Sequence, residues 1–576
     1  MTRALLALIL ACSVVAGFEP VTTYAQTPTL GQTGGRGVPR DPRPQATGGA
    51  TIRGRVLTAD GGTPIRRAQI RAISSDTRAS RLATTDGQGR FEFRDLAAGR
   101  WEITASKAGF VTLRYGQRRP FEAGRPIDLS ETQVVENADL ALPRGAAITG
   151  RVFDEFGDPV AGARVQVMRY QMVQGTRRLT QTNVGDQSDD TGAFRLFGLT
   201  PGDYYVSATV RALPVDDPTS DAAGYAPTYF PGTGNVAEAQ RVTVTVGQEI
   251  ANISFALLPV RTVRVTGNVI DSSGKPLTGG STILGPADGA GDLIAPGAGG
   301  NIRSDGTFIL TNVAPGSYTL TVTSRPQGFG RGGGRGGGGG TDTGEIASIP
   351  LTVGAEDVTG VYVVTSKGAT LSGTVTAAPE STAALPLSAI QITTQAVPQT
   401  RGIGTQSARL DAGGAFSLTG LLGPRAIRVT GLPSAWMLDA ITLNGSDITD
   451  KVLDFAGNQD LRGARVVVTD RVTALSGTVT SGSAVAHDYT VVVFPDDRDK
   501  WAFPSRYLRA GRPDQQGLFK ILALPPEAHY LAVAVDYLEE GEGSDPRFLE
   551  QIREHATPFS LGSGESKALD LKLVER

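Results

Sequence analysis

The sequence predicts an all-β chain of five tandem Greek-key-type β-sandwich domains that follow a signal peptide. Short Val, Ile and Thr runs alternate with polar residues, which is the period of half-buried strands. The 74 glycines and 34 prolines among 576 residues suit a chain with many turns. One short phrase also recurs five times, and recurrence at a fixed period indicates an array of one structural unit.

The recurring phrase is Asp-x-x-Gly-x-Phe, with Leu or Val five residues after the Phe; its third copy lacks the two residues between Asp and Gly. The Asp, Gly and Phe positions are Asp86, Gly89, Phe91; Asp189, Gly192, Phe194; Asp305, Gly306, Phe308; Asp411, Gly414, Phe416; and Asp514, Gly517, Phe519. At a turn, Asp accepts a hydrogen bond from the nearby backbone and Gly supplies a positive φ. We therefore expect each copy to form a β-turn from which the Phe enters a core strand.

A Gly-x-Val phrase upstream of each copy gives the domain period. It begins at Gly54, Gly150, Gly267, Gly373 and Gly477, at intervals of 96, 117, 106 and 104 residues. Units of this size can bury a core without covalent staples. The predicted sandwiches are residues 50–143, 144–260, 261–366 with a Gly-rich insertion at 328–340, 367–470 and 471–576.

The N-terminus predicts export. Arg3 supplies a positive charge, residues 4–16 supply a short apolar core, and Ala25 ends a small-x-Ala cleavage site, so residues 1–25 are predicted to be a signal peptide. Residues 26–49 are rich in Gly, Pro, Thr and Arg without periodicity, which predicts a disordered tether. We expect a secreted, periplasmic or outer-envelope protein with no transmembrane segment in its mature chain.

The only cysteine, Cys12, lies in the signal region. The mature chain therefore has no disulfide, which suits bacterial export. Ile9-Leu10-Ala11-Cys12 leaves open a lipoprotein with an acylated Cys12. We prefer plain secretion, because the apolar run continues past Cys12 and a good cleavage site follows.

Charge and motifs argue against catalysis and against nucleic-acid binding. The formal net charge of -2 provides no basic field, and the Arg-Gly stretch at 330–335 is interpreted as a floppy insertion. The three histidines are His487, His529 and His555, and the chain contains no H-E-x-x-H, G-x-S-x-G or phosphate-loop motif. We predict that the protein is not an enzyme and has no cofactor.

Two further features are read as structural. Asp186, Asp189 and Asp190 offer oxygen ligands for calcium, but turn capping explains the recurrence of such aspartates, so no metal site is predicted. Asp545-Pro546 places a cap and a first-turn proline before an apolar face, which predicts one short helix in the last domain.

The string from Ile148 to Val152, Ile-Thr-Gly-Arg-Val, resembles the carboxypeptidase regulatory-like domain family. The strings Asp189-Asp190-Thr191-Gly192-Ala193-Phe194 and Leu199-Thr200-Pro201-Gly202-Asp203-Tyr204 carry the same resemblance. It implies a transthyretin-like sandwich in a fold group with carbohydrate-binding-like domains and adhesin repeats, and it carries over no peptidase residues. Intramolecular isopeptide bonds of adhesin relatives need a buried Lys, whereas the Gly-x-Val strands here carry Arg or Thr, so such bonds are not expected in most domains.

Two aromatic loops are the candidate ligand-binding sites. The first contains Tyr225, Tyr229 and Phe230 in the second domain, and the second contains Trp501, Phe503 and Tyr507 in the fifth. Exposed rings could stack on sugar faces or anchor a protein partner. The simpler alternative is that these loops fold back and plug the ends of their sandwiches.

The sequence thus predicts a secreted, non-catalytic binding or spacer module of the cell envelope, with a glycan or an envelope protein as its partner. Glycan binding is the most concrete version, and it rests on the aromatic loops and on fold analogy. The alternative is an accessory subunit of a separately encoded envelope hydrolase or transporter. Because proline-bearing joints such as Leu142-Pro143-Arg144 are short, we expect an elongated monomer with the sandwiches end to end.

Overall fold

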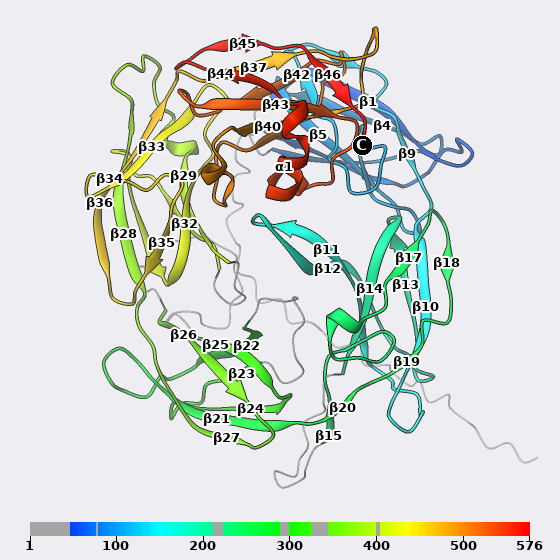
Figure 1. Ribbon diagram of the computed structural model, residues 1–576, viewed down its shortest axis with the longest axis vertical. Helices are drawn as coiled ribbons and strands as arrows, with labels where there is room; N and C mark the ends of the chain where they lie inside the picture. The colour runs from blue at the N-terminus through cyan, green and yellow to red at the C-terminus, as the bar shows by residue number, and fades with distance from the viewer. Residues whose placement is uncertain (1–46, 76–78, 211–222, 288–298, 325–343, 399–403) are drawn as a thin grey trace, which may run out of the picture. The chain divides into compact units, whose positions relative to one another are not determined.

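The computed structural model describes residues 47–75, 79–210, 223–287, 299–324, 344–398 and 404–576 (Figure 1). The predicted signal peptide, residues 26–46 of the predicted tether and the Gly-rich insertion lie outside these residues. The described chain folds into β-sandwiches with five main apolar cores, which confirms the predicted fold class. No helix in this part of the chain is long and apolar enough to cross a membrane.

Sandwich 1 begins with β1 at Thr47, three residues before the predicted start. Its first sheet contains β1 (Thr47–Thr58), β4 (Arg90–Leu96), β8 (Val134–Val135) and β9 (Leu140–Leu142). Its second sheet contains β2 (Gln69–Ser74), β3 (Ser80–Thr84), β5 (Gly99–Ser106), β6 (Leu113–Arg114) and β7 (Ile127–Leu129).

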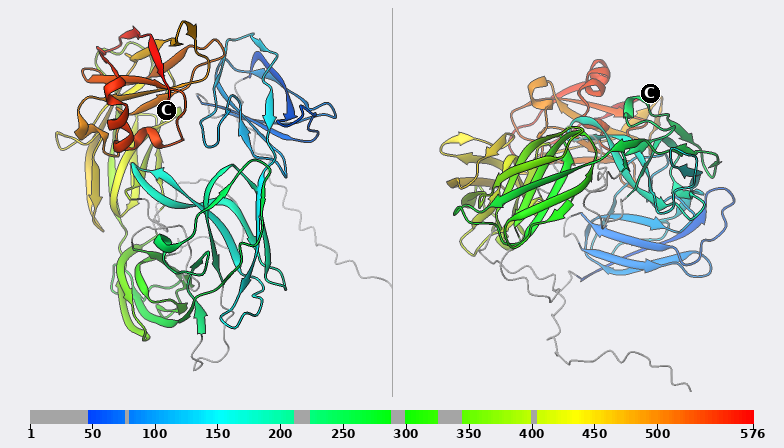
Figure 2. Two further views of the ribbon diagram at one scale, coloured as in Figure 1. Left: turned by 45° about the vertical axis from the view of Figure 1, so that its right-hand side comes forward. Right: turned by 90° about the horizontal axis from the view of Figure 1, so that it is seen from below.

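Sandwich 2 has the same plan and adds a long hairpin. Its first sheet contains β10 (Ala146–Phe153), β13 (Ala193–Leu199), β18 (Glu249–Ile250) and β19 (Phe255–Ala256). Its second contains β11 (Arg164–Val173), β12 (Thr176–Gln187), β14 (Gly202–Thr209), β16 (Thr228–Tyr229) and β17 (Val242–Val244); β15 (Ala223–Tyr225) pairs with β20 (Pro259–Arg261), and a 3-10 turn spans Val236–Glu238. Since β14 pairs with β11 only up to Met168, the β11–β12 hairpin extends beyond the sheet (Figure 2).

Sandwiches 3 and 4 keep the two-sheet plan. Sandwich 3 pairs a sheet of β21 (Val263–Ile270), β24 (Thr307–Val313) and β27 (Val358–Val364) with one of β22 (Gly280–Pro286), β23 (Gly299–Asn301), β25 (Gly316–Ser324) and β26 (Ile346–Val353). Sandwich 4 pairs a sheet of β28 (Ala369–Ala377), β31 (Ala415–Leu421), β33 (Met437–Leu443), β34 (Ser446–Asp447) and β36 (Asp460–Thr469) with one of β29 (Gln391–Ala396), β30 (Gln406–Arg409), β32 (Gly423–Thr430) and β35 (Val452–Phe455), and a 3-10 turn spans Leu387–Ala389. Figure 1 shows these two layers of sandwich 4.

Sandwich 5 contains the α-helix of the described chain. Its strands are β37 (Ala474–Gly477), β38 (Val479–Ser481), β39 (Ala484–Val485), β40 (Thr490–Pro495), β41 (Arg509–Gly511), β42 (Phe519–Leu522), β43 (His529–Val535), β44 (Thr557–Ser560), β45 (Ser566–Ala568) and β46 (Leu571–Val574), with 3-10 turns at Arg498–Trp501, Glu542–Ser544 and Arg553–His555. Helix α1 (Pro546–Ile552) is capped by Asp545, as predicted, and its apolar face packs on β40 and β43 (Figure 2).

One pairing recurs in every sandwich. The first strand lies antiparallel to the strand carrying the repeated Phe and parallel to the last strand of the same sandwich. The parallel pairs are β1 with β9, β10 with β19, β21 with β27, and β28 with β36. In sandwich 5 the first strand is split into β37 and β38, which pair in parallel with β45 and β46. The chain therefore enters and leaves each sandwich along neighbouring parallel strands.

Candidate functional site

The repeated Asp caps the turn in which it lies. In sandwich 1, Asp86 Oδ1 accepts hydrogen bonds from the backbone N–H groups of Gln88 and Arg90, both at 2.8 Å. Asp189, Asp411 and Asp514 make the same pair of bonds in their own turns. All five repeated glycines have a positive φ, between 72° and 83°. The predicted turn chemistry is therefore confirmed in four of the five sandwiches.

The third copy differs from the prediction. Its turn has the same length as the others, because Arg303 N donates to Thr307 O at 2.9 Å just as Asp86 N donates to Arg90 O at 3.0 Å. Asp305 lies two positions later in the turn and accepts from Thr307 N at 3.0 Å. The Asp has moved within the turn, and no residue has been lost.

Close packing of the repeated Phe and of the last strand explains why the Gly-x-Val phrase begins with glycine. A Cβ atom added at Gly267 would lie 2.7 Å from Phe308 Cε1 and would overlap the carbonyl oxygen of Val361 in the parallel last strand. The other four glycines of this phrase meet a carbonyl oxygen next to or within their own last strand in the same way. All five Phe side chains are buried. Both repeated phrases thus belong to one packing unit of the fold.

Two carboxylates of the acidic cluster in sandwich 2 accept hydrogen bonds from groups of their own domain. Asp186 Oδ2 accepts from Arg195 N at 2.9 Å, and Asp189 Oδ1 accepts from the hydroxyl of Thr191 at 2.8 Å. The Thr191 hydroxyl bond and the neighbouring backbone bonds lower the pKa of Asp189. These contacts support the turn-capping interpretation of this cluster.

The aromatic loop of sandwich 2 folds against its own domain. Tyr229 is buried, 6% exposed, in a small cluster with Met168 and Leu179. Phe230 packs edge-to-face on Phe255, with ring centroids 6.0 Å apart. Tyr225 is partly exposed and donates its hydroxyl to Glu155 at 2.7 Å. The buried Tyr229 cannot stack on a ligand in this conformation, which favours the plugging alternative for this residue.

The Trp501 loop divides into a buried and a partly exposed part. Trp501 is 5% exposed, packs on Phe494 at 5.7 Å and donates its indole N–H to Pro495 O at 2.7 Å. Phe503 and Tyr507 remain partly exposed. They line an open hollow of about 470 Å³ whose other wall is formed by residues 447–452 of sandwich 4.

Charged groups surround the two rings in this hollow. Lys500 Nζ lies 4.9 Å from the centre of the Tyr507 ring, and Arg506 Nε lies 3.0 Å from Asp450 Oδ2. Burial acts to raise the pKa of Asp447, but hydrogen bonds from Thr449 outweigh it, so the pKa of Asp447 lies below its ordinary value. The hollow therefore offers aromatic faces beside ionised donors and acceptors.

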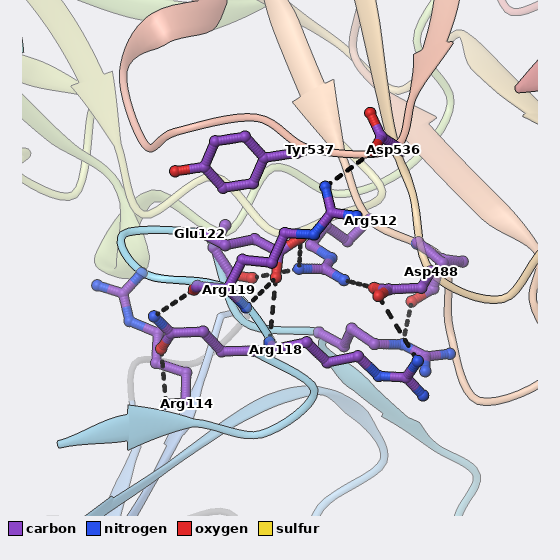
Figure 3. Close-up of polar contacts among 12 residues, drawn as sticks. Arg114, Arg118, Arg119, Glu122, Asp488, Arg512, Asp536 and Tyr537 are labelled. Atoms are coloured by element: carbon purple, nitrogen blue, oxygen red, sulfur yellow. Dashed lines mark hydrogen bonds and ion pairs between the residues drawn. The ribbon is translucent and has the colours of Figure 1, made fainter. Parts of the chain in front are cut away.

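A second polar site joins the first sandwich to the last. Its centre is residues 116–125 between β6 and β7, which we call the junction loop (Figure 3). Arg512 Nη1 of sandwich 5 lies 2.7 Å from Glu122 Oε1, and both side chains are almost fully buried, at 2% and 1% exposure. Arg512 also pairs with Asp488 and donates to Ala123 O at 2.9 Å.

More exposed ion pairs surround this buried pair. Figure 3 shows two of them, Arg119 with Asp536 at 2.9 Å and Arg118 with Asp488 at 3.6 Å. The third is Arg114 with Glu540 at 3.0 Å. In these three pairs every cation belongs to sandwich 1 and every anion to sandwich 5. The two faces are therefore complementary in charge.

Phe121 anchors the junction loop. It has a φ of 60°, which is unusual for a bulky side chain. Its ring packs edge-to-face on Tyr204, the guanidinium of Arg169 lies 3.3 Å from the ring centre, and Glu540 N donates to Phe121 O at 2.9 Å. Sandwiches 1, 2 and 5 thus meet at this one residue.

These contacts contradict the predicted end-to-end row of sandwiches. A straight row of five sandwiches would keep the first and the last apart, whereas Tyr537 donates its hydroxyl to Pro120 O at 2.9 Å. The junction residues were not predicted from the sequence. Arg114, Arg118 and Arg119 lie hundreds of residues from the carboxylates that they meet, and no local pattern marks these pairs.

Comparisons with known proteins identify part of the chain. Residues 51–142 match the family model of the carboxypeptidase regulatory-like domain, which confirms the predicted resemblance for sandwich 1. No curated protein matches the chain.

The solved structures that match the chain are distant from it in sequence. The TIE protein of Bacillus anthracis is 12% identical with a TM-score of 0.16, covering 74% of this chain and 73% of that one. The minor pilin GBS52 of Streptococcus agalactiae is 13% identical with a TM-score of 0.21, covering 37% and 96%. BcpA, the major pilin subunit of Bacillus cereus, is 11% identical with a TM-score of 0.13, covering 55% and 99%.

Proposed function

We propose that this chain, whose first sandwich is a carboxypeptidase regulatory-like domain, is an exported, non-catalytic binding module of the cell envelope and that it binds glycans. The observation that carries the proposal is the hollow at Phe503 and Tyr507. The repeated aspartates, glycines and phenylalanines serve the sandwich fold, so ligand binding falls to groups that differ between the domains.

The chemistry of the hollow suits a sugar. Carbohydrates present apolar C–H faces, which stack on aromatic rings, and hydroxyl groups, which exchange hydrogen bonds with carboxylates and guanidinium groups. Phe503 and Tyr507 supply the rings, Asp450 supplies a carboxyl acceptor and Arg506 supplies a guanidinium donor. A pocket with few, well-placed polar groups is the usual form of a small-ligand site.

Glycan binding can be tested with isolated full-length protein. Wild type on a glycan array, followed by titration calorimetry with each hit, should detect binding, and Tyr507→Ala or Phe503→Ala should weaken it at least about tenfold. Tyr362→Ala is a matched control, since Tyr362 is 60% exposed in sandwich 3, away from the hollow in sequence. Absence of glycan binding by wild type would remove this part of the proposal.

Export is tested separately. Intact-mass measurement of the protein recovered from outside the cytoplasm should give a chain that begins at Gln26. A chain that begins at an acylated Cys12 would replace the secreted form with a lipoprotein. Recovery of the uncleaved chain from the cytoplasm alone would contradict the envelope location.

A further inference from the structure

The junction between sandwiches 1 and 5 combines ion pairs with hydrogen bonds to backbone carbonyls, such as that from Tyr537 to Pro120 O. Nε of the buried Arg512 has no hydrogen-bond partner among the described residues. A buried ion pair gains little net free energy after desolvation, but a wrong partner, which leaves one charge unpaired, costs much more. The buried pair of Glu122 and Arg512 therefore contributes more to selecting the proper partner than to the strength of the junction.

The two faces can separate without exposing a core. Neither Glu122 nor Arg512 belongs to the apolar cores of sandwiches 1 and 5, and the arginines of the surrounding pairs already contact solvent. Opening would break the hydrogen bond from Glu540 N to Phe121 O. The Phe121 ring packs on Tyr204 and Arg169 of sandwich 2, so separating sandwiches 1 and 5 does not by itself remove its contacts.

We propose that the junction loop and the facing surface of sandwich 5 are a self-recognition pair that joins two copies of this chain when closure within one chain is prevented. The two faces are different surfaces of one chain, so the first sandwich of one copy can pair with the last sandwich of another, and reciprocal exchange closes both pairs. Within one chain, sandwiches 2 to 4 connect the two faces and so give them a high effective concentration. Closure within one copy therefore prevails in the wild type, and this inference is independent of glycan binding.

The test uses pairs of charge-reversed full-length variants. Glu122→Arg places two arginines at the buried pair, and Arg512→Glu places two glutamates there, so neither variant closes alone or pairs with itself. In an equimolar mixture of the two variants, the two reversed charges meet at one junction, while the other junction keeps the native pair of Glu122 and Arg512. Light scattering after size-exclusion chromatography should show a doubled mass only in the mixture.

A second mixture reverses the exposed pairs and leaves Glu122 in place, because Glu122 Oε2 also accepts from Arg118 N and Arg119 N within the loop. It combines R114E/R119E with D536R/E540R at low salt. The quadruple variant, which carries all four substitutions in one chain, should close within itself and have single-chain mass. Arg195→Glu with Arg241→Glu is the matched control, because both arginines pair within sandwich 2, and this variant should not associate with D536R/E540R.

A doubled mass in either junction mixture, absent from the separate samples and from the control, supports self-recognition. Single-chain mass in both junction mixtures overturns it.

Discussion

The turn formed by the repeated Asp, Gly and Phe, which we call the corner, and the junction loop use similar residues for different contacts. In the corner, Asp189 bonds to backbone groups within four residues, and Phe194 packs on Gly150 of the same sandwich. In the junction loop, Glu122 meets Arg512 and Phe121 meets Arg169, both from other sandwiches. The corner occurs five times and depends on burial, whereas the loop occurs once and depends on charge. The repeated residues stabilise the fold of each sandwich, and the contacts between sandwiches are made by residues that are not repeated.

The largest expected effect is the loss of a corner Phe. Phe308→Ala should destabilise sandwich 3 by about 3–5 kcal/mol, because it removes a fully buried ring and leaves a cavity. Hydrogen exchange of sandwich 3 peptides, followed by mass spectrometry, measures this local unfolding in the intact chain. Ile309→Ala is the control on the neighbouring residue, which is 38% exposed, and its effect should be small. Equal effects of the two substitutions would contradict the corner's dependence on burial.

The second effect tests the partner of that Phe. Gly267→Ala should cost about 1–3 kcal/mol, because the added methyl group would press on Phe308 and on the last strand. Gly285→Ala, in the same sandwich, should be nearly neutral, since nothing lies within 4 Å of its added Cβ. Hydrogen exchange of sandwich 3 peptides measures the stability of both glycine variants. Unchanged protection in Gly267→Ala would show that the parallel strand moves aside freely.

The third effect lies in the junction. Arg119→Ala and Asp536→Ala, combined in a double-mutant cycle on the exchange protection of residues 116–125, should give a coupling below about 1 kcal/mol. The coupling is small because Arg119 is 47% exposed, and it should vanish near 1 M salt. A coupling that salt leaves unchanged would mean that this pair is shielded from solvent, and the contrast with the corner would weaken.

The smallest effect is electrostatic and belongs to the corner. Hydrogen bonds lower the pKa of Asp189 in the folded chain, so its stabilisation is present above the ordinary pKa of about 4 and is lost as the pH falls through the lowered value. Asp189→Asn should therefore lower the calorimetric midpoint of sandwich 2 at pH 7, by at most about 3 °C, and the difference should disappear in acid. Asp190→Asn, at an exposed position of the same turn, is the control. A difference that persists unchanged in acid would exclude the charge as its cause.

Local signals made much of the fold predictable. The corners and helix α1 follow from turn and capping chemistry within a few residues, and both are found where the sequence predicts them. The extension of the β11–β12 hairpin was not predicted, because its tip strands pair only with each other and no third strand marks where they end. The changed position of Asp305 was missed because a spacing pattern cannot show which backbone groups a turn pairs.

The candidate sites were less predictable. The sequence marks Trp501 and Tyr507 as one aromatic loop, but the indole of Trp501 finds its acceptor at Pro495 O, inside the domain, and is buried there. The junction depends on partners hundreds of residues apart, such as Arg119 and Asp536, and no local pattern encodes which arginine meets which carboxylate.

The parallel pairing of first and last strands has a mechanical consequence. Because the chain enters each sandwich along one of these strands and leaves along its neighbour in the same direction, tension between the two ends of a sandwich pulls them past each other lengthwise. The hydrogen bonds joining the strands then bear the load together, in shear, and do not open one at a time as in a zipper. In sandwich 4, where β28 and β36 pair from Thr370 to Ala377, this arrangement couples the most residues to the pull. We expect a sandwich joined in this way to resist extension between its two ends.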